Sequence, residues 1–253
     1  MAPRVAMRSY PSSEACVSVS AVPVASPTGR DRVTHLRLLR AGAPAHAEVW
    51  LIEYAGQLAV LKSYAHGGWL FRTVAGAHLV RREAAAYRRL EGVAGVPRLL
   101  GCIGGEALVV EHIDGRNCLA GDTHQLGADF FAALNEILRA SRARGVLHGD
   151  VKRNVLCAGD GRPWLVDFGA SFVIGRWLSP LRPLILRVAA VYDQRAVAKL
   201  KRQVAPHLLT ADEGRLLDAR LPFEQLVKGG ERLLRWGTQW IKRRESRRST
   251  ADV

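Results

Sequence analysis

Asp150, Lys152 and Asn154 lie in one short polar segment whose residue types suit phosphoryl transfer. The segment 148–156 reads His-Gly-Asp-Val-Lys-Arg-Asn-Val-Leu and stands between apolar stretches. Phosphoryl transfer needs positioning, metal ligands and cations more than covalent help from the protein. Asp150 can accept or orient the proton of an incoming hydroxyl, and Lys152 can neutralise charge on the moving group. Asn154 can ligate Mg²⁺ through its amide oxygen.

Two further segments carry residues that such a reaction requires. Asp167 follows the apolar residues 164–166 and precedes Phe168 and Gly169, which suits a metal ligand at a mobile corner. Lys62 ends the apolar segment 59–62, and on its own it is explained more simply as a solvated strand end. Glu83 on the next predicted helix changes this interpretation, because a Lys–Glu pair would direct the ammonium group toward the non-transferred phosphates.

The elements around Lys62 and Glu83 predict a small sheet with one helix. Segments 33–39, 48–54 and 57–63 have strand-like composition, and Ala55-Gly56 predicts a tight turn between the last two. Residues 79–90 form a helix candidate, with Gly92 placed for a left-handed cap just past its end. Strands are also expected over 96–103 and 107–111, which completes a five-stranded sheet.

The later residues predict a more helical part. Apolar side chains recur at helical spacing from Phe130 to Leu138, and this helix is expected to stop at Gly145. Two short strands follow over 154–157 and 164–166, and the chain is mostly helical and basic after Asp167. The expected fold class is therefore α+β, with a sheet-rich small lobe followed by a reduced, mainly helical lobe.

Composition narrows the class of protein further. The chain has 253 residues, 48% hydrophobic content and a formal net charge of +14, which favours an anionic partner. The four cysteines show no CxxC pairing, so neither a disulfide framework nor a zinc site is expected and a reducing compartment fits best. No apolar run approaches the roughly 20 residues that a membrane-spanning helix needs. Residues 1–30 are interpreted as a disordered leader.

Taken together, the three segments resemble the signature set of the eukaryotic-type protein kinase superfamily, over roughly residues 33–170. Within it the chain is most similar to the bacterial RIO-like and lipopolysaccharide-core (Kdo-type) kinases. This resemblance implies a bilobal protein-kinase-like fold, with a kinase N-lobe over 31–113, a reduced C-lobe over 114–230 and a basic amphipathic helix and tail over 231–253. It also implies ATP and Mg²⁺ as cofactors.

The resemblance assigns a role to each candidate residue. It implies that Lys62 and Glu83 form an ion pair at the nucleotide, that Asp150 is the catalytic aspartate and that Asn154 and Asp167 are the metal ligands. Segment 111–113 resembles the hinge that binds adenine through backbone groups, which brings in Glu111 and Ile113. Gly42 and Val49 align with the phosphate-binding loop.

Four departures from the family pattern alter these expectations. Pro44 and Ala47 replace glycines in the phosphate-binding loop, which weakens its cradle of backbone amides and favours a pseudokinase scaffold as an alternative. Gly149 stands where the family has an arginine, as in small-molecule kinases. The loop from Asp150 to Asn154 is one residue short. No Ala-Pro-Glu follows Asp167, and RIO-type and sugar kinases share this shortened region.

The basic C-terminal segment leaves its partner open. Leu233, Leu234, Trp236, Trp240 and Ile241 fall on one helical face, and basic residues dominate the remainder of this segment. It predicts either a terminal helix docked on the large lobe or an interfacial helix on an anionic membrane surface. Nucleic acid is the least favoured partner, because no recognisable binding motif accompanies the charge.

The expected function is therefore transfer of the γ-phosphoryl group of ATP to a hydroxyl acceptor. A lipopolysaccharide-type sugar is the favoured acceptor, and a protein serine or threonine, as in RIO-like kinases, is the close alternative. A small soluble metabolite or antibiotic is less favoured, because no acidic cluster for a cationic drug is visible. The expected location is cytoplasmic, with peripheral attachment to the inner face of the membrane as a further option.

Overall fold

The computed structural model describes residues 33–42, 47–65, 75–120 and 126–219. The leader expected over residues 1–30 and the basic helix expected over 231–253 lie outside these ranges. So does Pro44 of the segment aligned with the phosphate-binding loop.

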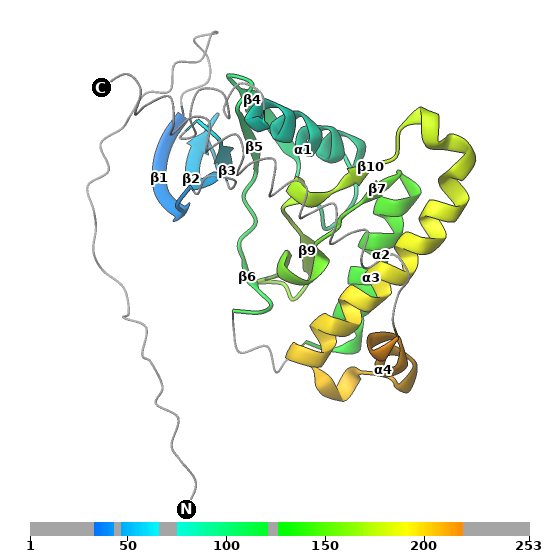
Figure 1. Cartoon of the computed structure of the whole chain (residues 1–253). Coiled ribbons are helices and arrows are strands. Elements are labelled where there is room, and N and C mark those ends of the chain that lie inside the picture. Colours follow the sequence, from blue (N-terminus) through cyan, green and yellow to red (C-terminus); the bar gives the residue numbers. More distant parts are fainter. Residues whose placement is uncertain (1–32, 43–46, 66–74, 121–125, 220–253) are drawn as a thin grey trace, which may run out of the picture.

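A five-stranded antiparallel sheet forms the N-terminal part of the chain, as predicted (Figure 1). Its strands follow the order β1-β2-β3-β5-β4, so the two strands after the helix add to the edge of the first three. The bounds are β1 (Val33–Arg40), β2 (Glu48–Tyr54), β3 (Gln57–Ser63), β4 (Leu99–Ile103) and β5 (Ala107–Glu111).

The turn between β2 and β3 sets the register of Lys62. Ala55 and Gly56 both have positive φ, 51° and 78°, which matches the right-handed twist of a tight hairpin. β2 and β3 then pair without interruption, and Val49 lies opposite Lys62. Side chains alternate between the two faces of β3, so Lys62 shares the face of Val60, which packs against the main core.

Helix α1 (Ala77–Arg89) covers this face of the sheet. Its buried side chains include Val80, Glu83, Ala84 and Tyr87, which is the spacing of one helical face. Glu83 is therefore carried into the interior by the same periodicity that buries the apolar residues. Gly92 has φ of 77° just beyond the helix end, as the sequence predicted.

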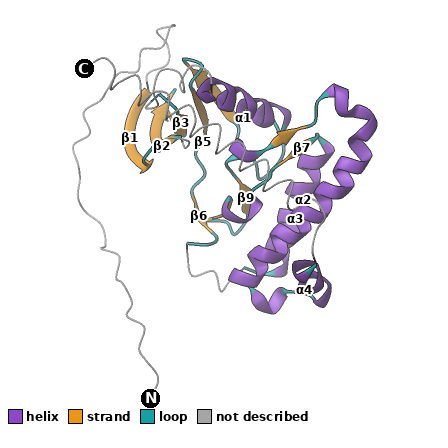
Figure 2. Cartoon of the chain, viewed as in Figure 1, coloured by secondary structure: helices purple, strands orange, loops and turns teal. Residues whose placement is uncertain are grey.

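The C-terminal part is more helical, as Figure 2 shows. Helix α2 (Ala128–Ala143) packs against α3 (Arg182–Val204), and α4 (Ala211–Asp218) contacts α3 in turn. The described residues of this part also form single-turn 3₁₀ helices at Val151–Arg153 and Phe168–Ala170. They contain five short strands: β6 (Gly115–Asn117), β7 (Val146–Leu147), β8 (Val155–Ala158), β9 (Pro163–Leu165) and β10 (Phe172–Val173).

One main hydrophobic core runs through both parts of the fold. It includes Val80 from α1, Leu108 from β5, Phe131 from α2, Leu165 from β9 and Leu200 from α3. A smaller cluster lies on the opposite face of the five-stranded sheet. Because the main core is shared, the residues carried by β3, α1 and the β8–β9 region are held at fixed positions relative to one another.

Some elements differ from their sequence-based predictions. β4 begins at Leu99 rather than at Val96, because the Val96 N–H closes a turn onto the Val93 carbonyl and Pro97 follows. The two- and three-residue strands β6, β7 and β10 were not predicted, since such short pairings leave no periodicity to detect. Among the helices of the described ranges, none has the length and apolar character needed to cross a membrane.

Candidate active site

Lys62, Glu83 and Asp167 form a three-way ionic contact between the sheet, α1 and the end of β9. The Lys62 Nζ atom lies 2.7 and 2.9 Å from the two Glu83 carboxylate oxygens and 2.7 Å from Asp167 Oδ1. Lys62 and Glu83 are 5% and 0% exposed, whereas the Asp167 side chain is 32% exposed. The structure thus joins residues from three distant segments, with Asp167 as the member that reaches solvent.

The trio contains one ammonium group and two carboxylates, so negative charge is in excess. Burial alone would lower the pKa of Lys62, but Glu83 and Asp167 outweigh it and raise that pKa above its ordinary value. Burial alone would raise the pKa of Asp167, but the charge and hydrogen bond of Lys62 outweigh burial, so the pKa of Asp167 is lowered. With Glu83 paired to the same ammonium group, two carboxylates share one cation. The site therefore favours an additional cation on its exposed side.

The backbone at Asp167 orients its carboxylate. Asp167 has φ of 61° and ψ of 74°, a left-handed conformation that aspartate tolerates better than most residues. The Gly169 N–H donates to Asp167 Oδ1 at 3.2 Å. A Cβ atom at Gly169 would lie 3.0 Å from that oxygen and 3.4 Å from Glu83 Oε2, so glycine leaves room for the trio. Both bonds engage Oδ1, which leaves Oδ2 for a further ligand.

His148 connects Asp150 to the strand that precedes Asp167. Its Nε2–H donates to the Val166 carbonyl at 2.9 Å, and its Nδ1 accepts the Asp150 N–H at 3.3 Å. These two bonds require the neutral ring with the proton on Nε2. Burial lowers the pKa of His148 to about 4, which agrees with a neutral ring. The ring therefore fixes the backbone of Asp150 relative to Asp167.

Asn154 lies beside Asp167 because β8 and β9 pair. The Val166 N–H donates to the Asn154 carbonyl at 2.9 Å, so the residue before Asp167 is held against Asn154. The Asn154 side chain donates through Nδ2 to the Asp150 carbonyl at 2.8 Å. This bond orients the amide and leaves its Oδ1 available, and it shows how the short loop closes on itself.

The arrangement of Asn154 and Asp167 fits Mg²⁺ bound together with phosphates. Mg²⁺ prefers oxygen ligands and usually takes one or two from protein and the others from phosphate and water. Asn154 Oδ1 and Asp167 Oδ2 are oxygens of this kind, on residues that the Val166–Asn154 backbone bond holds near each other. In the described ranges no cluster of three or more His, Cys, Asp or Glu side chains could hold a metal alone. A metal at this site would therefore depend on oxygens from a bound phosphate compound.

Of the residues predicted to bind the nucleotide, Val49 lies next to the trio, opposite Lys62. Gly42 and Val49 flank the residues 43–46, and Val49 is paired with Lys62 across the sheet. Glu111 ends β5, where it pairs with Ala59 of β3, and its side chain and N–H are both bonded to Arg98. Within the described ranges the backbone groups of Ile113 bond to no other backbone group.

Several residues at the site were missed by the sequence analysis. Arg82 donates from α1 to the Gly169 carbonyl, and Asn117 donates from β6 to the Arg153 carbonyl at 2.7 Å. The Phe168 ring is fully buried and packs edge-on against His148 and Tyr87, with centroid distances of 4.6 and 5.1 Å. Only the position of Arg82 next to Glu83 could have indicated a role, since the others depend on contacts between distant segments.

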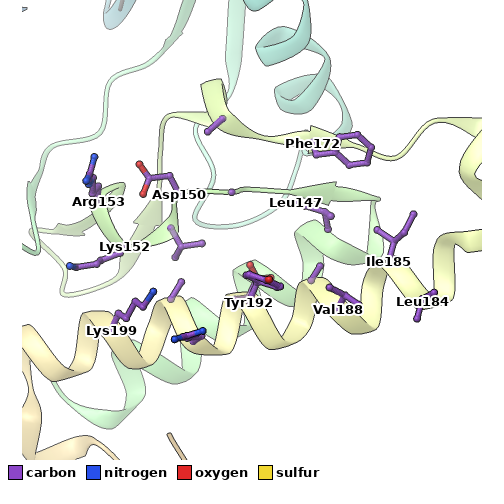
Figure 3. Close-up of a pocket in the computed structure, with 17 residues that line it drawn as sticks. Leu147, Asp150, Lys152, Arg153, Phe172, Leu184, Ile185, Val188, Tyr192 and Lys199 are labelled. Carbon is purple, nitrogen blue, oxygen red and sulfur yellow. The ribbon is translucent and has the colours of Figure 1, made fainter. Parts of the chain in front are cut away.

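A cavity of about 890 Å³ opens beside Asp150, between the segment 149–153 and helix α3. Figure 3 shows Asp150, Lys152 and Arg153 at one end of it, with Lys199 below them on the helix. Leu147 and Phe172 line it farther along, opposite Leu184, Ile185 and Val188. Asp150 therefore faces a space large enough for a second molecule beside the candidate nucleotide site.

Comparison with known proteins gave no relative: no protein family matches the chain, and no curated protein matches it either.

Proposed function

We propose that the protein is an ATP-dependent kinase of the protein-kinase-like superfamily, which transfers the γ-phosphoryl group to a hydroxyl acceptor. The observation that carries this proposal is the buried contact of Lys62 with Glu83 and Asp167, at 2.7 Å to each carboxylate. Structural ion pairs seldom place two carboxylates on one buried lysine, because desolvation of three charges is costly. Binding of a nucleotide and its Mg²⁺ ion explains why two carboxylates lie at one lysine.

Each residue of the site has a role in this proposal. Lys62, held by Glu83, contacts the non-transferred phosphates, and Glu111 and Ile113 offer backbone groups to the adenine. Asn154 Oδ1 and Asp167 Oδ2 would hold Mg²⁺, which would neutralise charge on the phosphate oxygens. Gly42 and Val49 border the phosphates from the sheet.

The transfer step requires an acceptor hydroxyl at Asp150. The hydroxyl oxygen forms a bond to the γ-phosphorus while the bond to the β,γ-bridging oxygen breaks, and ADP leaves with that electron pair. The hydroxyl proton passes to the Asp150 carboxylate. Lys152, on the same 3₁₀ turn, neutralises charge on the phosphoryl group as it moves.

The proposed acceptor is a lipopolysaccharide-type sugar, and a protein serine or threonine is the alternative. In the described residues after Asp167 the helices are α3, α4 and short 3₁₀ turns, and a substrate region of this size suits a compact acceptor better than an extended peptide. ATP as the donor fits a cytoplasmic location, and the net charge of +14 fits peripheral attachment to its anionic inner membrane face.

The experiment that tests this proposal is ATP turnover with Mg²⁺ in the wild type and in Asp150→Ala and Asp167→Ala. Loss of a general base typically lowers the rate by about 10²–10⁴-fold, and Asp150→Ala should fall in that range while nucleotide binding persists. Asp218→Ala, at an exposed aspartate of α4, serves as the matched control and should keep wild-type turnover. Equal turnover in all four proteins would refute the kinase proposal.

A pseudokinase scaffold is the second candidate. Two observations favour it: Pro44 stands in the segment aligned with the phosphate-binding loop, and Lys62 already bonds to Asp167 Oδ1. A scaffold would bind nucleotide with little turnover in the wild type, and Asp150→Ala would then change neither quantity.

A further inference from the structure

The cavity beside Asp150 has two chemically different ends. Four cations line it, Lys152, Arg153, Arg195 and Lys199, against the carboxylates of Asp150 and Asp193. Asp193 forms an ion pair with Arg142 behind the cavity, so its charge is already compensated. At the end near Asp150, Lys152 and Arg153 lie beside the single carboxylate of Asp150, so these three residues together carry a positive charge, which favours an anionic ligand.

The other end is apolar and open to solvent. Leu184 and Phe172 line it with 61% and 47% of their surface exposed, and Leu147, Ile185 and Val188 continue the apolar wall. Figure 3 shows Val188 on one turn of α3 and Ile185 and Leu184 on the turn before it, farther from Asp150. Large exposed apolar side chains that line one groove indicate a surface that binds an apolar group.

We propose that the acceptor is an anionic amphiphile. Its hydroxyl lies at Asp150, its negative group lies near Lys152, Arg153 and Lys199, and its apolar chain extends along α3 to Leu184. This inference rests on the proposed function and specifies the acceptor. A soluble sugar would leave the apolar wall uncovered, and a peptide substrate would not require a continuous apolar wall beside a cationic end.

The order of the groups along the cavity supports one molecule rather than two. The hydroxyl-activating carboxylate and the cations lie on the segment 149–153 and the adjoining turns of α3, and the apolar residues follow on the preceding turns. An α-helix rises about 1.5 Å per residue, so Val188 lies about 16 Å along α3 from Lys199, a distance that a chain of about a dozen methylenes spans. A headgroup and its attached chain match this sequence of surfaces.

The test measures binding without nucleotide, by calorimetry below the critical micelle concentration, with octyl phosphate, inorganic phosphate and octyl glucoside. Octyl phosphate carries both features, inorganic phosphate only the charge, and octyl glucoside only the chain. Each methylene that the cavity buries should tighten binding about threefold, so octyl phosphate should bind at least about thirtyfold tighter than inorganic phosphate. Similar affinities for octyl phosphate and inorganic phosphate would overturn the proposal.

Two variants locate the binding site. Val188→Ser should weaken octyl phosphate about threefold and leave inorganic phosphate unchanged, since it removes apolar contact alone and Val188 is the apolar residue of this wall nearest the cationic end on α3. Leu58→Ser is the matched control, because Leu58 is 50% exposed on β3 and does not line the cavity. Lys199→Gln should weaken both phosphate compounds and leave octyl glucoside unchanged. Equal effects of Val188→Ser and Leu58→Ser would contradict the assignment.

ATP turnover of the same preparations separates this inference from the proposed function. Wild-type turnover that depends on Asp150, combined with no preference for octyl phosphate, would reject the amphiphile and retain the kinase. Phosphoryl transfer to a serine peptide, but not to hydroxyl-bearing phosphatidylglycerol in detergent micelles, would also reject the amphiphile. Tight octyl phosphate binding without Asp150-dependent turnover would reject the kinase and retain the cavity as an amphiphile site.

Discussion

A Cβ atom on Gly149 would lie 2.7 Å from the carbonyl oxygen of Ala170, which is closer than side chains approach backbone oxygens in folded proteins. Gly149 also has φ of 83°, in the left-handed region. The residue before Asp150 is therefore glycine for two reasons: its own backbone conformation and the close packing of the segment after Asp167. This contact brings the two aspartate-bearing segments together.

Gly149→Ala should destabilise the protein more than an alanine at a glycine of the same backbone conformation. Gly161 has φ of 78°, and a Cβ atom there would meet open space, so Gly161→Ala should cost about 1–2 kcal/mol of unfolding free energy from conformation alone. Gly149→Ala should cost a further 1–3 kcal/mol or so from overlap with Ala170. Urea denaturation measures both, and equal losses would show that the Ala170 contact is unimportant.

Lys62→Met should destabilise the fold by about 3–5 kcal/mol, because it leaves the buried Glu83 carboxylate unpaired. Adding Glu83→Gln should recover at least about 1 kcal/mol of this loss, since the double variant buries no unpaired charge. If the proposed function holds, ATP turnover stays lost in both. Thermal and urea denaturation of the two variants provide the measurement.

The matched control for Lys62→Met and its double variant is Arg98→Met, which breaks the exposed ion pair with Glu111 at 3.2 Å. Arg98 is 63% exposed on its side chain, so solvent screens the pair and the expected loss is about 0–1 kcal/mol. A loss at Arg98 as large as that at Lys62, or a double variant less stable than Lys62→Met, would contradict the buried trio as described.

Stability should fall as the pH decreases from 6.5 toward 4, through His148. The pKa of His148 is lowered from 6.5 to about 4 in the fold, so the unfolded chain binds a proton in this range before the folded chain does. Through this group alone, the free energy of unfolding should be about 2 kcal/mol lower at pH 5 than at pH 7. Asp167, whose pKa is lowered, contributes only near and below its ordinary pKa of 3.8.

The His148→Gln variant isolates this contribution from that of other titrating groups. This variant should be less stable than the wild type at pH 7. The difference between their free energies of unfolding should become smaller as the pH approaches 5. Urea midpoints at pH 7, 6 and 5 test this. Parallel pH profiles in the two proteins would mean that His148 is not held neutral in the fold.

Asn154→Ala should raise the Mg²⁺ concentration needed for half-maximal ATP turnover by about tenfold, as the loss of one metal contact typically does. Asn117→Ala is the comparison, because Asn117 also bonds to this loop, through the Arg153 carbonyl, but is assigned no metal. It should lower the rate without shifting the Mg²⁺ requirement. The same shift in both variants would remove Asn154 from the metal site.

The elements near Lys62 could be predicted from sequence because their signals are local. Ala55-Gly56 fixed the hairpin, and the periodicity of α1 placed Glu83 on the buried face. The short strands β6, β7 and β10 could not be predicted, since they are stabilised by partners from distant segments. Asp150, Asn154 and Asp167 were proposed as site residues from their type and spacing, whereas Arg82 and Asn117 bond to backbone carbonyls of distant segments, which no motif records.

The sequence by itself determined the α+β order of elements and the residue types that line the candidate site, because side-chain chemistry and hydrophobic periodicity are properties of short segments. Only the tertiary structure decided that Lys62 contacts both Glu83 and Asp167, that His148 is a neutral link from Asp150 to Val166, and that a polarised cavity lies along α3. These features depend on how the shared core holds distant segments together, and local sequence patterns do not specify those distances.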